Sequence, residues 1–469
     1  MLHGLVLRFA TDHRANVAVI FAVMMVPTIY LLGMALDYTQ ALRKQGQLDA
    51  AADAAAVAAV RPAMLTQTDA SVVQATAAAV FAAKANMPGL TVVPTPTITV
   101  TDTGLQRTIT VSYAAQSINN FPSVLGSPAW PVQGSATARA SSAPNMNFYL
   151  LLDDSPSMAI AATQADIDKL ISATKNQPSG SKNCGFACHE LHPNLDSGAS
   201  SSTNDNLSVA RSNSVTLRID LVVNAVKQLL VGPWSCLQSG VSGGVMQCMS
   251  AINNTTYKAA IYTFDYNLNT IQTLTTPSTA GTQISNIQLL TVDHQNCVTT
   301  SICNTDFGTD ISGALTGVNK IMPDPGTGTN QSSDTPQEVV FLVTDGVEDK
   351  LIAKTASCDA NATYPLPAAG TQVRCQQPLD TTICDTIKKR NIRIAILYTE
   401  YLQLTSDGWY NSRIAQFNNP SSSTGTIAQR LQSCASPGLF ANVQTGGDIS
   451  SALTNLFLKV ASSTASLVQ

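Results

Sequence analysis

The segment FYLLLDDSPS, residues 148–157, joins a short apolar run to a cluster of carboxyl and hydroxyl side chains. The run FYLLL is continuous rather than alternating, which is typical of a strand buried on both faces of a parallel sheet. Asp153, Ser155 and Ser157 follow directly, at every second position. Because ligands bind beyond the carboxyl ends of such strands, we expect these three side chains to form part of a binding site.

Strand and helix patterns alternate on the C-terminal side of this segment. The predicted strands are YKAAIYTF (257–264), EVVFLVT (338–344) and IRIAILYT (392–399). The predicted helices are SVTLRIDLVVNAVKQLLV (214–231), ISGALTGVNKIM (311–322), DTTICDTIKKR (380–390) and ISSALTNLFLKVAS (449–462). This alternation predicts a doubly wound, Rossmann-like α/β domain over residues 143–469. A Ser-, Gly- and Asn-rich stretch at about 180–206 is predicted to be an exposed insertion held by Cys184 and Cys188.

Two further segments place oxygen-bearing side chains at element ends. Thr309 precedes the helix ISGAL, and Asp345 follows the strand EVVFLV within Thr344-Asp345-Gly346. A shell of hydroxyl and carboxylate oxygens selects Mg²⁺, Mn²⁺ or Ca²⁺ over zinc or copper. With few charged ligands, a vacant coordination position stays electrophilic and suits an acidic side chain from a partner protein. The alternative is that these Asp and Ser residues only cap helices.

The order of these motifs is similar to a known pattern. Asp-x-Ser-x-Ser after the first strand, then a Thr, then Asp-Gly after a later strand resembles the metal-ion-dependent adhesion site of von Willebrand factor A domains. The resemblance implies that Asp153, Ser155, Ser157, Thr309 and Asp345 bind a divalent metal. We expect Mg²⁺, with Mn²⁺ or Ca²⁺ as alternatives, and no catalytic activity.

Residues 15–36, ANVAVIFAVMMVPTIYLLGMAL, carry no charge. As a helix this run spans about 33 Å, which is enough to cross the hydrocarbon core of a bilayer. A secretory signal peptide is the alternative, but its apolar core is usually about 7–15 residues long. We therefore predict a single transmembrane helix, with residues 1–14 in the cytoplasm. The basic residues on either side of the run do not decide its orientation.

Residues 37–142 predict a small α+β module. Strong helix formers continue from the apolar run to about Val60, where Arg61-Pro62 ends the helix, and a second Ala-rich helix covers Ala70–Ala85. TVVPTPTITV, RTITVSYAAQ and GSATARASS, between residues 91 and 142, show the alternation of strands.

The segment from Arg14 to Ala59 resembles the N-terminal segment of TadE/TadG-like Flp (tight-adherence) pilus-assembly proteins. The shared features are an Asn near the start of the span, Asp37-Tyr38 at its exit and the helix AADAA. The resemblance implies an adhesion or assembly protein of a bacterial pilus system that binds protein partners of the pilus machinery. A structural stalk component with a purely stabilising metal site is the alternative.

The cysteines indicate the compartment of the C-terminal domain, and the charge indicates which classes of partner to expect. Ten cysteines, none before Cys184, favour disulfides and place the C-terminal bulk in the periplasm or outside the cell, with reduced buried cysteines in the cytosol as the alternative. Charged residues make up 12% of the 469 residues and the net charge is −4, so no basic surface for nucleic acid is expected.

Cys184-Gly-Phe-Ala-Cys188-His189 is one residue longer than a haem-attachment motif, and Gly240–Gly244 fits the G-x-S-x-G motif of hydrolases around Ser242. We favour a local disulfide for the first motif and a flexible loop closed by a disulfide for the second, with a haem-bearing or hydrolytic envelope protein as the less favoured alternative.

Overall fold

The computed structural model describes most of the chain. The described residues are 16–90, 95–103, 105–121, 126–177, 182–184, 206–236, 240–290, 308–329, 333–358, 363–364, 372–401, 410–419, 425–461 and 465–468. They form two compact units, which we describe separately. The first contains the residues up to Ser142 together with the C-terminal strand, and the second runs from Ala143 to Ser462.

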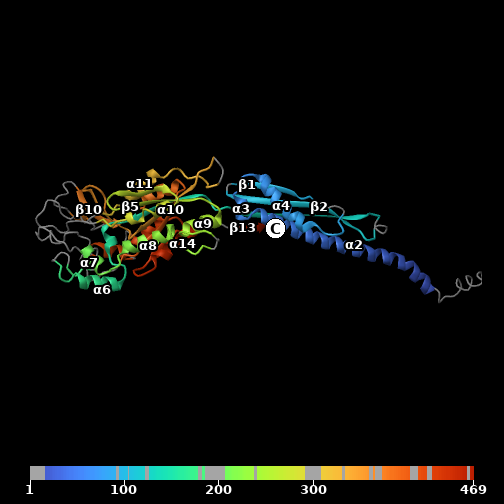
Figure 1. Cartoon of the computed structure of the whole chain (residues 1–469), viewed down its shortest axis with the longest axis horizontal. Coiled ribbons are helices and arrows are strands. Elements are labelled where there is room, and N and C mark those ends of the chain that lie inside the picture. The colour runs from blue at the N-terminus through green and yellow to red at the C-terminus, as the bar shows by residue number, and fades with distance from the viewer. Residues whose placement is uncertain are drawn as a thin grey trace, which may run out of the picture. The chain divides into compact units, whose positions relative to one another are not determined.

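The N-terminal unit packs helices against one antiparallel sheet. Its helices are α2 (Asn16–Ala59), α3 (Pro62–Leu65) and α4 (Ala70–Ala85). Its strands are β1 (Thr97–Thr103), β2 (Gln106–Ile118), β3 (Ala129–Ser141) and β13 (Ala465–Val468), in the order β1-β2-β3-β13. Helix α4 and the sheet pack along α2 (Figure 1). The predicted helix ends near Val60 and at Ala85 and the three predicted strand regions are confirmed, whereas β13 lies at the end of the range that we assigned to the α/β domain.

Alanine allows α2 to lie close to its neighbours. Ala51, Ala52, Ala55 and Ala56 are all buried, and they face Phe81 of α4 and the strands of the sheet. A methyl side chain loses no rotamer entropy on burial and keeps the helix backbone near the opposing surface. The polar Arg107 is buried in this unit because Asp102 and the carbonyl oxygens of Met64 and Gln67 accept its guanidinium hydrogens.

The second unit is built on a six-stranded sheet in the order β12-β11-β7-β4-β5-β6. The strands are β4 (Met146–Asp153), β5 (Tyr257–Phe264), β6 (Leu268–Thr275), β7 (Gln337–Thr344), β11 (Arg393–Thr399) and β12 (Phe440–Val443). All neighbours are parallel except β5 and β6, which are antiparallel. Numbered along the chain, this is the 3-2-1-4-5-6 order of a doubly wound sheet with an antiparallel edge strand. The predicted fold class is therefore confirmed.

Helices cover both faces of this sheet. Its helices are α6 (Gln164–Ala173), α7 (Asn206–Ser212), α8 (Arg218–Leu230), α9 (Val245–Asn253), α10 (Pro277–Gly281), α11 (Ile311–Ile321), α12 (Thr382–Lys389), α13 (Ile427–Cys434) and α14 (Ile449–Ala461). Phe148 and Leu150 of β4 point to the core shared with α8 and α14, and Tyr149 and Leu151 point to the core shared with α11, α12 and α13. Figure 1 shows α8 and α14 together on one side and α11 on the other. This two-sided burial explains why FYLLL is apolar at every position.

A second, smaller sheet follows β7 directly. Strands β8 (Val347–Ala353) and β10 (Gln372–Pro378) pair antiparallel, and β9 (Thr363–Tyr364) joins β10. The sequence analysis did not predict this sheet. It also began the helix of residues 214–231 too early, because Leu217 pairs with Ala161 and α8 begins only at Arg218. The predicted insertion falls largely outside the described residues.

Three disulfides are described in the second unit: Cys236–Cys248, Cys358–Cys375 and Cys384–Cys434. None of the described cysteines is free. Cys384 and Cys434 are fully buried and join α12 to α13, on the face of the sheet that packs against both helices.

Replacing Cys384 and Cys434 together by alanine should lower the free energy of unfolding of the second unit by about 4 kcal/mol, because this disulfide closes the longest of the three loops. Its sequence separation is 50 residues, against 12 for Cys236–Cys248. The matched double replacement of Cys236 and Cys248 should cost about 3 kcal/mol. Denaturant unfolding of both variants measures the two losses, and a larger loss for the shorter loop would contradict this account.

Candidate metal-binding site

Asp153 is the last residue of β4, and the turn after it brings two hydroxyl groups back toward its carboxylate. The backbone N–H of Ser155 donates to Oδ1 of Asp153 at 3.0 Å, and the hydroxyl of Ser155 donates to the same oxygen. The hydroxyl of Ser157 lies 3.2 Å from that of Ser155. Pro156 starts a short 3₁₀ turn (Pro156–Ala159), which fixes this path. The Asp-x-Ser-x-Ser segment therefore gathers its three side chains at one strand end.

Asp345 follows the neighbouring strand β7, which pairs in parallel with β4. The hydroxyl of Thr344 donates to Oδ2 of Asp153 at 2.6 Å and links the two strand ends. Gly346 turns the chain with φ of +84°, and a Cβ on it would lie 2.5 Å from Cγ2 of Ile427. Only glycine satisfies both conditions, so the turn into β8 that positions Asp345 depends on it.

The carboxyl group of Asp345 is fully buried, and neither of its oxygens accepts a hydrogen bond from a described residue. The nearest cation is the guanidinium of Arg218, with Nη1 3.8 Å from Oδ2 of Asp345. Arg218 is held at the start of α8 by the carbonyl oxygen of Glu400 at 2.7 Å, and its guanidinium lies over the ring of Tyr401. A buried carboxyl without hydrogen bonds is costly, and this arrangement indicates a place for a cationic ligand.

The two carboxyl groups disfavour each other's ionisation. Burial, and secondly the charge of Asp345, raise the pKa of Asp153 to about 8. Burial also raises the pKa of Asp345, while Arg218 and the nearby hydroxyl of Ser157 oppose that increase. Two carboxyl groups this close in a dry environment do not both ionise at neutral pH, so the pair retains a proton there.

Thr309 is placed at the same end of the sheet through its backbone. Its N–H donates to the carbonyl oxygen of Asp349, and its own carbonyl oxygen accepts from the N–H of Asp349 at 2.8 Å. On the other side, the N–H of Asp310 donates to the carbonyl oxygen of Asp265, just beyond β5. The side chain of Thr309 is buried. This segment is therefore fixed between β5 and β8, next to the strand end that carries Asp345.

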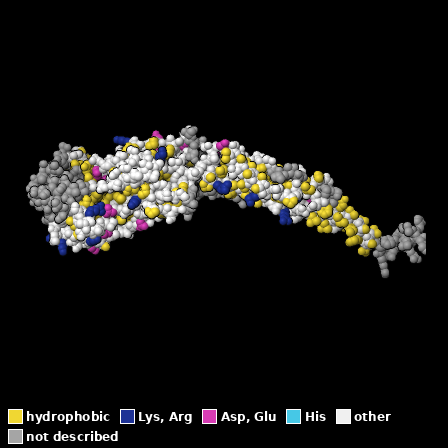
Figure 2. All heavy atoms as spheres, in the orientation of Figure 1, with side chains coloured by type: hydrophobic (Ala, Val, Ile, Leu, Met, Phe, Trp, Pro, Cys, Tyr) yellow, Lys and Arg dark blue, Asp and Glu magenta, His cyan; other side chains and the backbone are white. Residues whose placement is uncertain are grey.

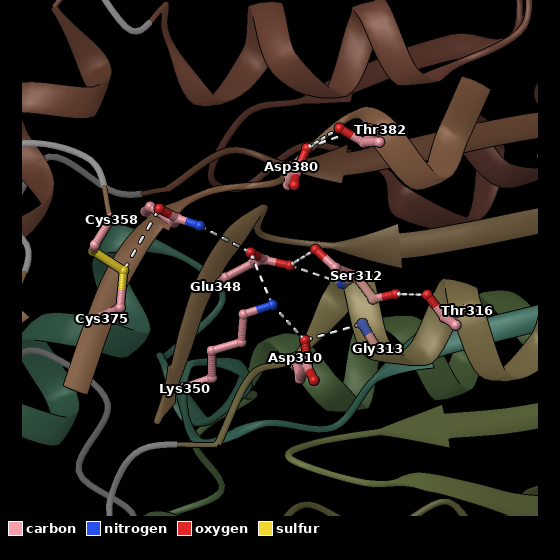
Figure 3. A network of polar contacts seen from close by, with 11 residues as sticks. Asp310, Ser312, Gly313, Thr316, Glu348, Lys350, Cys358, Cys375, Asp380 and Thr382 are labelled. Atoms are coloured by element: carbon pink, nitrogen blue, oxygen red, sulfur yellow. Dashed lines mark hydrogen bonds and ion pairs between the residues drawn. A yellow bond between two sulfur atoms is a disulfide. The ribbon is translucent and has the colours of Figure 1, made fainter. Parts of the chain in front are cut away.

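A charged network reinforces the position of the Thr309 segment (Figure 3). The ammonium group of Lys350 on β8 lies 2.7 Å from Oδ1 of Asp310 and 3.3 Å from Oε2 of Glu348. Glu348 also accepts the N–H and the hydroxyl of Ser312, in the first turn of α11. The network ties the loop with Thr309 to the strand that continues from Asp345.

The structure thus brings Asp153, Ser155, Ser157 and Asp345 together by side-chain proximity, and Thr309 by backbone pairing. No group of three or more His, Cys, Asp or Glu side chains suited to a metal occurs among the described residues. The sequence analysis missed Arg218 and the role of Thr344. Thr344 stands directly before Asp345, whereas nothing in the sequence pairs Arg218 with Asp345.

The G-x-S-x-G segment around Ser242 and the cysteine segment at Cys184 lie in surroundings that differ from those of the enzyme motifs they resemble. Ser242 is exposed in the loop closed by Cys236–Cys248, between helices α8 and α9. A hydrolase nucleophile of the G-x-S-x-G type instead follows a buried strand. Cys184 is disulfide-bonded, so it has no thiol for haem attachment. Cys188 and His189 lie outside the described residues.

Comparison with known proteins identifies the N-terminal segment. Residues 15–83 match the TadE/G-like Flp pilus-assembly family, which confirms the resemblance seen in the sequence. No curated protein matches the chain.

Similar solved structures include three bacterial proteins. The von Willebrand factor domain of the type V pilus tip protein Mfa5 from Porphyromonas gingivalis is 10% identical, and the match covers 68% of this chain and 96% of that chain with a TM-score of 0.32. BatB from Bacteroides thetaiotaomicron is 10% identical, with 68% of this chain and 99% of that chain covered and a TM-score of 0.30. The pilus adhesin RrgA from Streptococcus pneumoniae is 10% identical, with 81% of this chain and 51% of that chain covered and a TM-score of 0.31. At these low scores the fold assignment rests on the strand order, the antiparallel edge strand and the positions of the motif segments.

The metal-free chain should lose stability as the pH rises from about 4 to about 8. The folded state holds a proton on Asp153 that the unfolded chain releases near its ordinary pKa of 3.8, so the folded state binds more protons in this window. Thermal unfolding in a chelator at several pH values should show the decline, and Asp153→Asn should reduce its slope.

Asp154 provides a second, independent test of the same pH dependence. Burial raises its pKa to about 7, so Asp154→Asn should also reduce the slope, although Asp154 is not a predicted ligand. A stability of the metal-free parent that increases with pH across this window would contradict the description of the carboxyl pair.

Proposed function

We propose that this chain is an envelope-anchored, metal-dependent adhesion or assembly protein of a Flp/Tad-type pilus system. The observation that carries the proposal is the buried carboxyl of Asp345, which accepts no hydrogen bond from the part of the chain that the structure describes and lies beside Asp153, Ser155 and Ser157. Such a group is stabilised by a cation, and the surrounding donors are all oxygen.

The residues present fit Mg²⁺ or Mn²⁺, with Ca²⁺ as an alternative. Asp153, Ser155, Ser157, Thr309 and Asp345 would hold the ion, and an open coordination position on it would accept an acidic side chain of a partner protein. Ser157 is the one partly exposed member of the five, so the partner would approach from its side. Asp153 and Ser155 orient each other by hydrogen bonds before any ligand arrives, which preorganises the site.

Three features support a position in the bacterial envelope. Helix α2 is long and apolar enough to cross a membrane, with a mean hydropathy of 2.3 in its most apolar window. Residues 15–83 match a pilus-assembly family. The described disulfides suit an oxidising compartment. We infer a single-pass protein of the inner membrane whose C-terminal bulk lies in the periplasm or outside the cell, where it binds other pilus components.

A structural stalk component is the second candidate. Asp153, Ser155 and Asp345 have no exposed surface, which suits a cation that only stabilises the loops. In that case the ion would add to the stability of the fold by mass action without binding a partner.

Isothermal titration of Mg²⁺ and Mn²⁺ into the purified chain tests the site. The parent and Asp154→Asn should bind one ion, and Asp153→Ala and Asp345→Ala should bind it more than about 100-fold more weakly, because they lose a direct ligand. Binding should also release protons, so the measured heat should depend on the ionisation enthalpy of the buffer. Equal affinity in the parent and in Asp345→Ala would remove these residues from the site.

The relaxation of water protons distinguishes the two candidates. Mn²⁺ at an adhesion-type site keeps an exchangeable water, so the complex should increase the relaxation rate of bulk water, and a glutamate-containing peptide should reverse the increase. A closed stabilising site should bind Mn²⁺ with no such increase and no effect of the peptide.

A further inference from the structure

Helix α2 is buried along one stripe that continues into its apolar run. Gly33, Asp37 and Ala41 are buried and lie four residues apart on one face of the helix. The residues between them are exposed. Since Gly33 belongs to the run of residues 15–36, the folded N-terminal unit covers part of the predicted membrane span itself.

The connection that follows β2 provides this cover. The carboxylate of Asp37 accepts the backbone N–H groups of Asn120 at 2.7 Å and of Phe121 at 3.0 Å. The ring of Phe121 lies against Gly33, where an added Cβ would be 3.2 Å from the ring. Charge-assisted hydrogen bonds to Asp37 and the missing side chain at Gly33 together hold this connection against the helix.

Large apolar side chains surround the contact and remain exposed. They are Tyr38 (48% exposed), Ile118 (44%), Phe121 (37%) and Trp130 (37%). Tyr38 and Trp130 pack edge to face, with ring centroids 5.6 Å apart. Figure 2 shows that the exposed part of α2 carries hydrophobic side chains along its length. The cluster is therefore continuous with the apolar surface of the helix.

The depth of the cluster matches a membrane interface. Gly33 lies about 4–5 Å along the helix axis before the end of the apolar run at Leu36. The polar interface of a bilayer adds roughly 5–8 Å to each side of a hydrocarbon core about 30 Å thick. Tyr and Trp concentrate at this level, and the exposed Arg43 lies on the next part of the helix, where lipid phosphates occur.

We propose that Tyr38, Ile118, Phe121 and Trp130 form a second membrane contact, which inserts into the lipid interface beside the anchor helix. This inference rests on the proposed membrane span of α2. The occupant is the lipid surface rather than a protein, because the cluster lies beside Gly33 and Tyr38, at the point where the proposed span leaves the hydrocarbon. The N-terminal unit is then fixed in orientation to the bilayer by its sheet as well as by its helix.

Quenching of Trp130 by spin-labelled lipids tests the contact. The chain has three tryptophans, so Trp234→Phe combined with Trp409→Phe leaves Trp130 as the fluorophore. The full-length variant is reconstituted into phosphatidylcholine–phosphatidylglycerol vesicles that carry a nitroxide at carbon 5 or at carbon 12 of the acyl chain. Trp130 should be quenched roughly twofold more strongly by the shallow label than by the deep one.

A variant that keeps only Trp234 is the matched control, because Trp234 packs in the second unit and should not be quenched. If the variant with both Trp234→Phe and Trp409→Phe folds poorly, the quenching of Trp130 is obtained as the difference in quenching between the parent and Trp130→Phe. A chain that floats with the vesicles but shows no quenching of Trp130 would overturn the second contact and leave the anchor intact. A chain that does not float with them would overturn both.

Discussion

The burial of two carboxyl groups, Asp153 and Asp345, at the ends of adjacent parallel strands is the constraint around which the second unit is organised. Parallel pairing of β4 and β7 places the two groups side by side, and neither has exposed surface. Burying a charged carboxylate without a partner is strongly unfavourable, so the neighbouring elements must supply compensation. Ser155 and Thr344 donate hydrogen bonds to Asp153, and Arg218 faces Asp345. The start of α8 and the turn at Gly346 both lie against this pair, and β8 continues directly from it.

The compensation is unequal for the two groups. Asp153 accepts hydrogen bonds at both oxygens. Among the described residues Asp345 accepts none, and the more distant guanidinium of Arg218 is its nearest cation. Arg218 is itself held by Glu400 and Tyr401, so it cannot approach Asp345 without losing those contacts. The network of Lys350, Glu348 and Asp310 keeps the Thr309 segment beside β8 independently of the carboxyl pair. The Thr309 segment is therefore held in place apart from the carboxyl pair. Among the predicted metal ligands, all of which are described, the buried oxygens without a hydrogen-bond partner are those of Asp345.

The sequence predicted the parts of this structure that depend on local patterns. Continuous apolar strands, amphipathic helices and polar residues at strand ends were sufficient for the doubly wound sheet and for four of the site residues that the structure brings together by their side chains. The Ala70–Ala85 helix was predicted with the observed bounds from its alanine content, and in the structure Asp69 caps its start. The strands β8 and β10 were missed because VEDKLIA and QVRCQQP are polar, and their stability comes from pairing with each other. Arg218 was missed for a similar reason, since on an amphipathic helix it resembles a solvent-facing charge and only the fold brings it to Asp345.

Charge balance links the carboxyl pair to the proposed binding of a partner. At neutral pH the pair retains a proton, and Arg218 faces its remaining negative charge, as the burial of charge requires. A divalent cation that displaces the proton would leave the cluster with a net positive charge, because the guanidinium of Arg218 adds its own positive charge. A second anionic group is then needed, and the described contacts place no further carboxylate against Asp153 or Asp345. An acidic side chain that enters past Ser157 would restore neutrality. If the carboxyl pair binds a divalent metal as we propose, Arg218 is on this argument the residue that makes an acidic partner necessary.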